Sequence, residues 1–285
     1  MALQPHLVAL VLLAAITHAT WNALVKTSGD DRFLTMVFVV GVGTVLGIPL
    51  IPFIPLPHPD SWPYLAASTL LHNGYYVILI MAYRVGDLSQ VYPLARGTAP
   101  LLVALLAAYF AGETLGLGGM VGVGLVSVGI VSLMFVGGIP RGEAQKPIFL
   151  ALGTSVFIAS YTIVDGLGMR LAGPPWGYIL WLNILEGIPF IIAAYFLRHR
   201  HDVSGFFERR WKKGFAGGVL AIVAYGLVLY ALSQGAMAYV VAMRETSVLF
   251  VAVIGSLILK ETFGKVRIIA AMIIVTGLVT LQLSG

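Results

Sequence analysis

The sequence contains no cysteine and few charged residues. Because cysteine is absent, the chain has no disulfide framework and no thiolate metal site. Only 10% of its 285 residues are charged, whereas a soluble globular protein carries about 25%. Hydrophobic residues make up 59% of the chain, and its mean hydropathy is +0.95. A water-facing surface cannot be assembled from this composition, so the sequence indicates a membrane protein.

Motifs of the main enzyme classes are missing as well. The chain lacks the H-E-x-x-H and G-x-S-x-G motifs, any paired-aspartate metal motif and a P-loop. We therefore expect no cofactor and no catalytic residue. The net charge of +5 comes from basic residues at the ends of apolar runs. This placement favours contact with anionic lipid and gives no reason to expect a nucleic-acid partner.

The chain is divided into apolar runs long enough to cross a bilayer as helices, which takes about 20 residues each. Short connections between most of them predict antiparallel hairpins, and we expect the longest polar stretch, Arg198–Lys213, to be one loop. The predicted fold is an all-α membrane protein with ten transmembrane helices, near 5–26, 32–52, 62–84, 88–111, 115–136, 146–171, 176–197, 213–235, 237–259 and 264–283.

Basic residues are distributed unevenly between the two sides of this arrangement. All but three of the 17 Lys and Arg residues flank the connections that follow odd-numbered helices. Of the other three, Arg170 flanks an even-numbered helix, and Arg96 and Arg244 lie inside helices. Cytoplasmic loops are rich in Lys and Arg. This bias predicts a protein of the cell (inner) membrane with both termini on the non-cytoplasmic side.

The second half of the chain repeats the first. The segment Arg96–Gly116 returns without a gap as Arg244–Gly264, with Arg, Thr, Glu and Gly at matching positions. Each half contains five predicted helices, so the second enters the membrane upside down relative to the first. We expect two units, 1–138 and 146–285, related as inverted repeats around a central cavity.

Two paired motifs carry a family resemblance. Gly112-Glu113-Thr114-Leu115-Gly116 matches Lys260-Glu261-Thr262-Phe263-Gly264, and Ala19-Thr20-Trp21-Asn22 matches Ala159-Ser160-Tyr161-Thr162. The chain thereby resembles the drug/metabolite transporter superfamily, EamA type, over its whole length, and within it the YddG-like amino-acid exporters. The resemblance implies export of small metabolites through a cavity formed mainly by helices 1, 3, 4, 6, 8 and 9.

Ionisable residues inside the predicted helices are the first candidates for function, because a charge in the bilayer costs about 2.5–3.5 kcal/mol on insertion scales. Arg96 and Arg244 lie at similar depths from opposite faces, as gates or anion-binding groups or as structural arginines bonded to helix carbonyls. Asp165 lies at the depth of Arg244, which predicts an outer gate made by that pair or a permanent ion pair. Glu186 and Glu245 could carry a coupling proton or be hydrogen-bonded structural groups.

Aromatic and polar side chains on the cavity helices form a second set of candidates. They combine an apolar body with a hydrogen-bonding tip, which suits an amphiphilic substrate such as an amino acid. Alternatively, Trp and Tyr can anchor the protein at the membrane interface. A lone membrane histidine is usually only hydrogen-bonded. His18, Trp21 and Asn22 share one face of helix 1, and His72, Tyr76 and Tyr83 share one face of helix 3. The predicted substrate-binding residues are His18, Trp21, Asn22, His72, Tyr76, Tyr83, Arg96, Tyr161, Asp165, Tyr225 and Arg244.

Some residues at helix ends and inside helices have structural interpretations. Glu113 and Glu261 are expected to cap the helices that follow them. The Gly43-x-x-x-Gly47 and Gly118-x-x-x-Gly122 motifs predict close helix packing within a monomer. Proline at three positions inside predicted helices predicts hinges or static kinks: Pro93, Pro100 and Pro189.

The function that these features favour is secondary transport. We expect a monomer that exports small molecules, amino acids first and aromatic or amphiphilic drugs second, by alternating access. A channel and an intramembrane enzyme remain as alternatives. The two halves differ in their cavity residues, since Asp165 has no counterpart in the first half, and this asymmetry favours a carrier over a pore lined by rings of identical groups.

Overall fold

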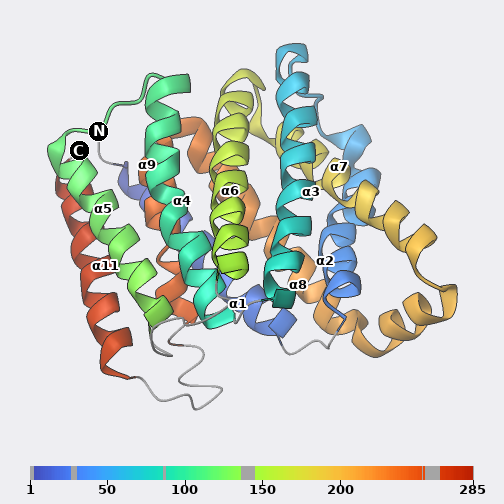
Figure 1. The fold of residues 1–285 in the computed structure, drawn as a ribbon. Helices are drawn as coiled ribbons and strands as arrows, with labels where there is room; N and C mark the ends of the chain where they lie inside the picture. Colours follow the sequence, from blue (N-terminus) through green and yellow to red (C-terminus); the bar gives the residue numbers. More distant parts are fainter. Residues whose placement is uncertain are drawn as a thin grey trace.

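A computed structural model describes residues 3–26, 31–85, 88–135, 145–251, 253 and 264–284, and these ranges contain helices and connections but no strand (Figure 1). The long helices are separated by short turns and by 3-10 segments at Ile48–Phe53, Pro59–Ser61 and Leu133–Phe135. The helices are α1 (Pro5–Lys26), α2 (Arg32–Gly47), α3 (Trp62–Val85), α4 (Leu88–Phe110), α5 (Leu117–Ser132), α6 (Gln145–Leu171), α7 (Pro175–Leu197), α8 (Arg200–Gln234), α9 (Met237–Arg244) and α11 (Lys265–Leu283).

The helices satisfy their own backbone hydrogen bonds, which a chain needs in lipid. Eight helical segments of the described residues are long and apolar enough to cross a membrane, beginning with Phe33–Phe53. The 22-residue α1 coincides with the first expected span, and the ninth expected span lies partly outside the described residues. The predicted all-α fold is confirmed, and the chain is a multi-pass membrane protein.

Two expected boundaries are wrong. The stretch Arg198–Lys213 is not one loop, because α8 begins at Arg200 and continues to Gln234 as a 35-residue helix. The ninth expected helix is interrupted: α9 ends at Arg244, and Glu245 and Thr246 form a turn before the chain becomes helical again at Ser247. Most of the rest of that predicted span, and Glu261, lie outside the described residues.

Helix packing follows the inverted repeat. The repeat matches α1 with α6, α2 with α7, α3 with α8 and α5 with α11. Accordingly, α1 packs against α8 as α6 packs against α3, while α2 packs against its own counterpart α7 and α5 against its counterpart α11. In Figure 1, α5 and α11 lie together at one side of the bundle and α2 and α7 toward the other. Exchanging the two halves thus preserves the main helix contacts.

Glycines show the same symmetry at atomic detail. A Cβ on Gly122 would lie 2.9 Å from the Gly277 carbonyl oxygen, and one on Gly129 would lie 3.1 Å from the Ala270 carbonyl oxygen. The sequence repeat pairs Gly129 with Gly277 and Gly122 with Ala270, so it exchanges these two contacts. As residue numbers rise along α5 they fall along α11, and the helices are therefore antiparallel. On the other side, Gly43 and Gly47 pack closely against Asn183 and Ile184 of α7. The expectation that the glycine motifs pack within the monomer is confirmed.

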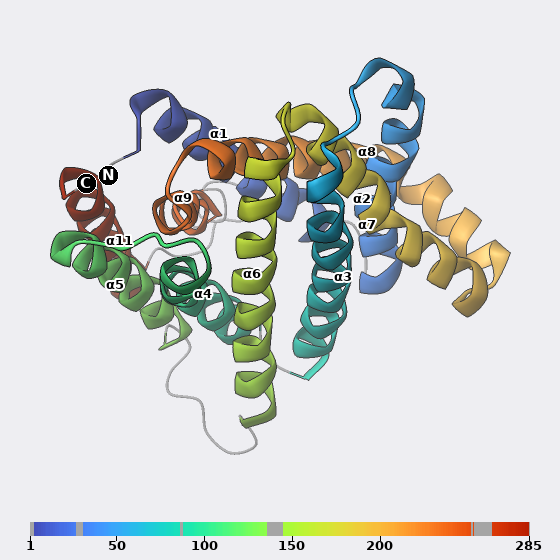
Figure 2. The same ribbon diagram turned by 90° about the horizontal axis from the view of Figure 1, so that it is seen from above.

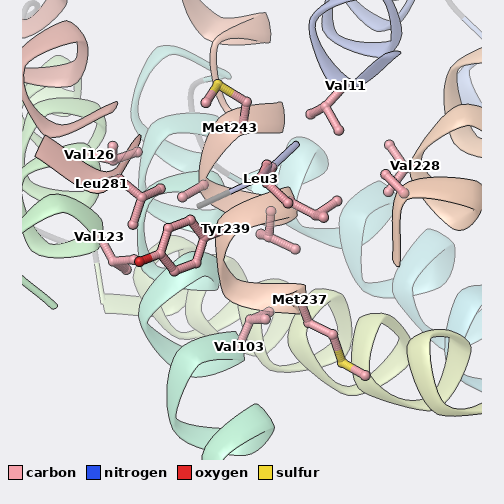
Figure 3. Close-up of a cluster of buried hydrophobic side chains, with 14 of the residues drawn as sticks. Leu3, Val11, Val103, Val123, Val126, Val228, Met237, Tyr239, Met243 and Leu281 are labelled. Atoms are coloured by element: carbon pink, nitrogen blue, oxygen red, sulfur yellow. The ribbon is translucent and has the colours of Figure 1, made fainter. Parts of the chain in front are cut away.

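The largest apolar core of the described residues joins α1, α4, α5, α6, α8, α9 and α11. Figure 3 shows its centre, where Tyr239 of α9 lies among side chains from its neighbours. Seen from above, α9 lies between α1 and α4 (Figure 2). All eight residues of α9 are buried. This short helix is therefore held on every side, and its last residue, Arg244, is fixed in the interior.

Both chain ends lie at the same end of the bundle, at the upper left of Figure 1. Gln282 Nε2 donates to the Leu3 carbonyl oxygen at 2.8 Å and joins the two ends directly. At the opposite end, Arg198 Nη2 lies 3.2 Å from Asp31 Oδ2, and Asp31 also caps α2 by accepting from the Leu34 N–H at 3.0 Å.

Candidate functional site

A buried histidine lies between two buried carboxylates at the junction of α3, α6 and α7. Nδ1 of His72 is 3.3 Å from Glu186 Oε1, and its Nε2 is 3.9 Å from Asp165 Oδ2. Asp165 is fully buried and His72 is 3% exposed. We call His72, Asp165 and Glu186 the acidic trio. Among the described residues, no group of three His, Asp or Glu side chains has a geometry that could hold a metal ion.

Asp165 is held by two tyrosines. Tyr178 OH of α7 donates to its Oδ1 at 3.0 Å, and Tyr225 OH of α8 donates to its Oδ2 at 2.5 Å. Asp165 and Arg244 form no direct ion pair among the described residues, so the expectation of a permanent pair is wrong, while a gate that forms and breaks stays a prediction. The matched depths inferred from sequence could not show that Tyr225 lies between the two residues.

Glu186 makes a second set of contacts. Its Oε2 accepts a hydrogen bond from Tyr76 OH at 3.3 Å, and its backbone carbonyl accepts from Asn73 Nδ2 at 3.4 Å. Both donors belong to α3, so Glu186 joins α7 to the same helix that carries His72. The predicted residue Tyr76 thus reaches the buried centre, and Glu186 belongs there too.

Aromatic rings surround the trio. Tyr161 of α6 stacks on the His72 ring at a centroid distance of 4.0 Å, and Tyr225 meets that ring edge-on at 5.2 Å. Tyr75 contacts both Tyr76 and Tyr161. The candidate residues of helices 3, 6 and 8 are therefore brought together. Their packed rings occupy the region where the sequence predicts the central cavity.

Arg96 has a different partner from any expected in sequence. Its Nε donates to Glu245 Oε2 at 2.9 Å, and its Nη2 lies 2.7 Å from Glu245 Oε1. Both side chains are buried, with exposed fractions of 3% and 1%. Because Arg96 belongs to the first repeat and Glu245 to the turn after α9, this buried ion pair joins the two halves. The Nε contact is a charge-assisted hydrogen bond, and the Nη2–Oε1 contact is an ion pair without hydrogen-bond geometry.

Arg244 is the repeat counterpart of Arg96, yet its surroundings differ. Its guanidinium carbon lies 5.7 Å from the centroid of the Tyr225 ring, within cation–π range. The position equivalent to Glu245 in the first half is Gly97, and its virtual Cβ would meet Val131 and the Ser127 carbonyl oxygen of α5. The first half has no room for a carboxylate there, so the two arginines cannot be paired alike.

The α1 candidates contact one another. Trp21 Nε1 donates to His18 Nδ1 at 3.2 Å, and Asn22 Nδ2 donates to the His18 carbonyl oxygen at 2.8 Å. The three residues share one face, as the spacing predicts, and His18 is half-buried within electrostatic reach of Arg96 and Arg244. The side chain of Tyr83, the remaining candidate, lies outside the described residues.

The expected role of Glu113 is wrong. It does not cap α5, whose N-cap is Gly116 with no side-chain cap. Glu113 Oε2 instead accepts the Met237 N–H at 2.7 Å and so caps α9, while its Oε1 accepts from Arg170 Nη2 at 2.5 Å. Arg170 Nη2 also donates to the Gly235 carbonyl at 2.9 Å. The carboxylate does meet a helix N-terminus, but that helix comes from the other repeat, which local sequence cannot reveal.

Sequence reasoning missed three contributors to this centre. Tyr178 and Tyr75 had no distinguishing signal among the 12 tyrosines, and Ser68, whose Oγ lies 3.0 Å from His72 Nδ1, looked like any small helix residue. Glu186 was visible as a rare mid-helix carboxylate.

A separate apolar groove of about 400 Å³ lies between α3 and α6 and shares none of the predicted residues. It is lined by Asn73, Gly74, Val77, Ile78, Met81, Leu150 and Phe157.

Buried charges at the meeting point of two inverted helical repeats define a class of membrane transport protein. The chain belongs to the EamA-like transporter family, whose model matches residues 7–135 and 145–282. It is a membrane transporter of small molecules. A solved structure titled "Crystal structure of protein" is 18% identical, with a TM-score of 0.79 over 97% of this chain and 99% of that chain, and shows the fold alone. No curated protein matches the chain.

Proposed function

We propose that this transporter exports amino acids by alternating access, with the substrate bound where Tyr225 separates Arg244 from Asp165. One observation carries the proposal. The Tyr225 ring lies under the guanidinium group of Arg244, and the Tyr225 hydroxyl donates to Asp165. A positive and a negative group therefore lie on either side of one aromatic side chain, and a zwitterion carries the two complementary charges.

The α-carboxylate of the substrate would bind Arg244, because Arg96 is already engaged by Glu245. The α-ammonium would bind Asp165, whose present partners are two neutral hydroxyls. Tyr75, Tyr76 and Tyr161 provide apolar surface for a side chain, and rings of this kind favour aromatic and amphiphilic groups. This arrangement supports the resemblance to YddG-like exporters and leaves aromatic drugs as a second substrate class.

Transport through a buried centre requires the two repeats, 1–138 and 146–285, to rock against each other around it. In this proposal the protein works as a monomer in the inner membrane, with both termini outside. A channel would need an open path, whereas the described centre is filled by packed side chains. An intramembrane enzyme would need a nucleophile and an oxyanion site beside its base; Ser68 Oγ lies 3.0 Å from His72 Nδ1, so product formation by the purified protein would favour that alternative.

Counterflow in proteoliposomes tests the proposal. Vesicles loaded with unlabelled phenylalanine should accumulate labelled phenylalanine, and the initial rate should saturate with external concentration. Arg244→Gln and Tyr225→Phe should reduce the rate at least about tenfold, since each removes one element of a charged, desolvated site. Tyr230→Phe is the matched control, because Tyr230 lies on the same helix and stacks on the exposed Trp176. Uptake that rises without saturation would indicate a channel, and absence of counterflow for every amino acid would refute amino-acid export.

A further inference from the structure

The buried positive and negative charges of the described residues do not balance. Apart from tyrosine, the buried ionisable side chains of the described residues are Arg96, Arg244, Asp165, Glu186, Glu245 and His72. With histidine neutral, two arginines face three carboxylates. Arg96 and Glu245 neutralise each other through their direct contact. Arg244, Asp165 and Glu186 then leave one uncompensated negative charge in a desolvated region, where such a charge costs several kcal/mol.

The geometry shows where a neutralising proton can reside. Nδ1 of His72 lies 3.0 Å from the Ser68 carbonyl oxygen and 3.3 Å from Glu186 Oε1. The Ser68 hydroxyl also lies 3.0 Å from Nδ1 and can donate or accept, so either tautomer of the neutral imidazole fits these contacts. The exchangeable proton therefore belongs on His72, Asp165 or Glu186. Because Nε2 is 3.9 Å from Asp165 Oδ2, the imidazole connects the two carboxylates.

No other described group competes for this role. His18 accepts the Trp21 N–H at Nδ1, which keeps that nitrogen unprotonated. The remaining groups packed around the trio are tyrosine hydroxyls, neutral near pH 7 because their ordinary pKa is about 10, and the arginines. Taken by helix, they are Tyr75 and Tyr76 of α3, Tyr161 of α6, Tyr178 of α7, Tyr225 of α8, Arg96 of α4 and Arg244 of α9.

We propose that the acidic trio holds one exchangeable proton, that a substrate with a net positive charge displaces it, and that a zwitterion does not. The inference rests on the proposed substrate site beside Asp165. Without substrate, the buried centre is electrically neutral when one proton is bound. A zwitterion adds no net charge, so the proton stays. An amine without a carboxylate adds one positive charge, and neutrality then requires one proton to leave. Export of cationic amines is thereby coupled one-for-one to proton entry, whereas export of neutral amino acids is not.

A matched pair of ligands separates the two cases. Phenylalanine and phenylethylamine share the same ring and ammonium, and only the first has a carboxylate. Binding to the purified protein in detergent is measured by calorimetry at about pH 7, where both amines are protonated. Repeating it in two buffers with different protonation enthalpies gives the number of protons released. We expect about one proton released for phenylethylamine and about none for phenylalanine, in line with neutrality of the buried centre.

Variants test the assignment to the trio. Glu186→Gln makes the centre neutral without a proton, so it should release no proton with either ligand, and its preference for phenylalanine over phenylethylamine should rise at least about tenfold relative to wild type. Glu186→Asp keeps the charge and should restore proton release, which shows that a weak variant has not merely misfolded. Glu208→Gln, the same change at an exposed residue of α8, should behave as wild type in both measurements.

The outcomes are distinct. Equal proton release for the two ligands, or unchanged release in Glu186→Gln, refutes the exchange while leaving amino-acid transport intact. Binding of phenylalanine but not of phenylethylamine also refutes it. If neither ligand binds, the substrate site beside Asp165 is wrong, and the exchange fails together with the proposed function.

Discussion

Replacing Glu245 by glutamine should destabilise the protein far more than its surface counterpart does. Glu245 binds Arg96 at two points, 2.9 and 2.7 Å, and both side chains are buried. Removing one partner of a buried pair costs about 3–5 kcal/mol because the other charge remains desolvated. Here the loss leaves two buried arginines, Arg96 and Arg244, facing the site that Glu245 neutralised. For a chain of this size the cost corresponds to roughly a 10 °C fall in Tm.

The chain supplies its own reference pair. Asp31 and Arg198 have the same chemistry at 3.2 Å, but their side chains are 34% and 37% exposed. Surface pairs contribute about 0–1 kcal/mol. Asp31→Asn should therefore lower Tm by no more than about 3 °C. Unfolding is followed in detergent by the loss of monodisperse protein on heating, with both variants purified in parallel.

A double-mutant cycle decides whether the pair itself is responsible. Arg96→Met combined with Glu245→Leu removes both charges, and paired removal is often neutral or stabilising. We expect the double variant to be more stable than Glu245→Gln, with a coupling energy of at least about 2 kcal/mol. If Glu245→Gln and Asp31→Asn lower Tm equally, or if the double variant loses the sum of the single effects, the reasoning about desolvated charge is refuted.

Three further predictions follow from other parts of the structure. Gly277→Val should lower the free energy of unfolding by about 1–3 kcal/mol by overpacking α5 against α11, since its Cβ would lie 2.8 Å from the Gly122 carbonyl oxygen. Gly124→Ala should be tolerated, because its Cβ would have no neighbour within 4 Å, and thermal unfolding compares the two variants. Asp165 and Arg244 should show a weaker coupling in a stability cycle than Arg96 and Glu245 do, because Tyr178 and Tyr225 hold Asp165; an equal coupling would mean that the gate pair forms directly. Single cysteines at Ser204 and Ser284 should react with an impermeant maleimide from opposite sides of intact cells, with position 284 labelled from outside; equal labelling of both would contradict the Lys and Arg bias.

The sequence alone determined the features that depend on composition and periodicity. A charged fraction of 10% and runs of about 20 apolar residues allow only membrane-spanning helices. The matched segments from Arg96 and Arg244 fixed the repeat, and an odd number of helices per half required inversion. These properties are local or additive along the chain, so no knowledge of contacts is needed to infer them. The residues Asp165, His72 and Tyr225 were likewise visible, because polar groups in apolar helices are costly and therefore conspicuous.

Tertiary structure decided which of those residues meet. Arg96 pairs with Glu245 across the two halves, Glu113 caps α9 and not α5, and Asp165 is held by tyrosines and not by Arg244. Each outcome depends on the rotation and depth of helices far apart in sequence, which small shifts in packing change. Equal depth places two residues in one layer of the membrane, but only the packed neighbours determine whether they touch. Tyr225 contacts both Asp165 and Arg244, and that single ring stands where the sequence predicts a direct ion pair.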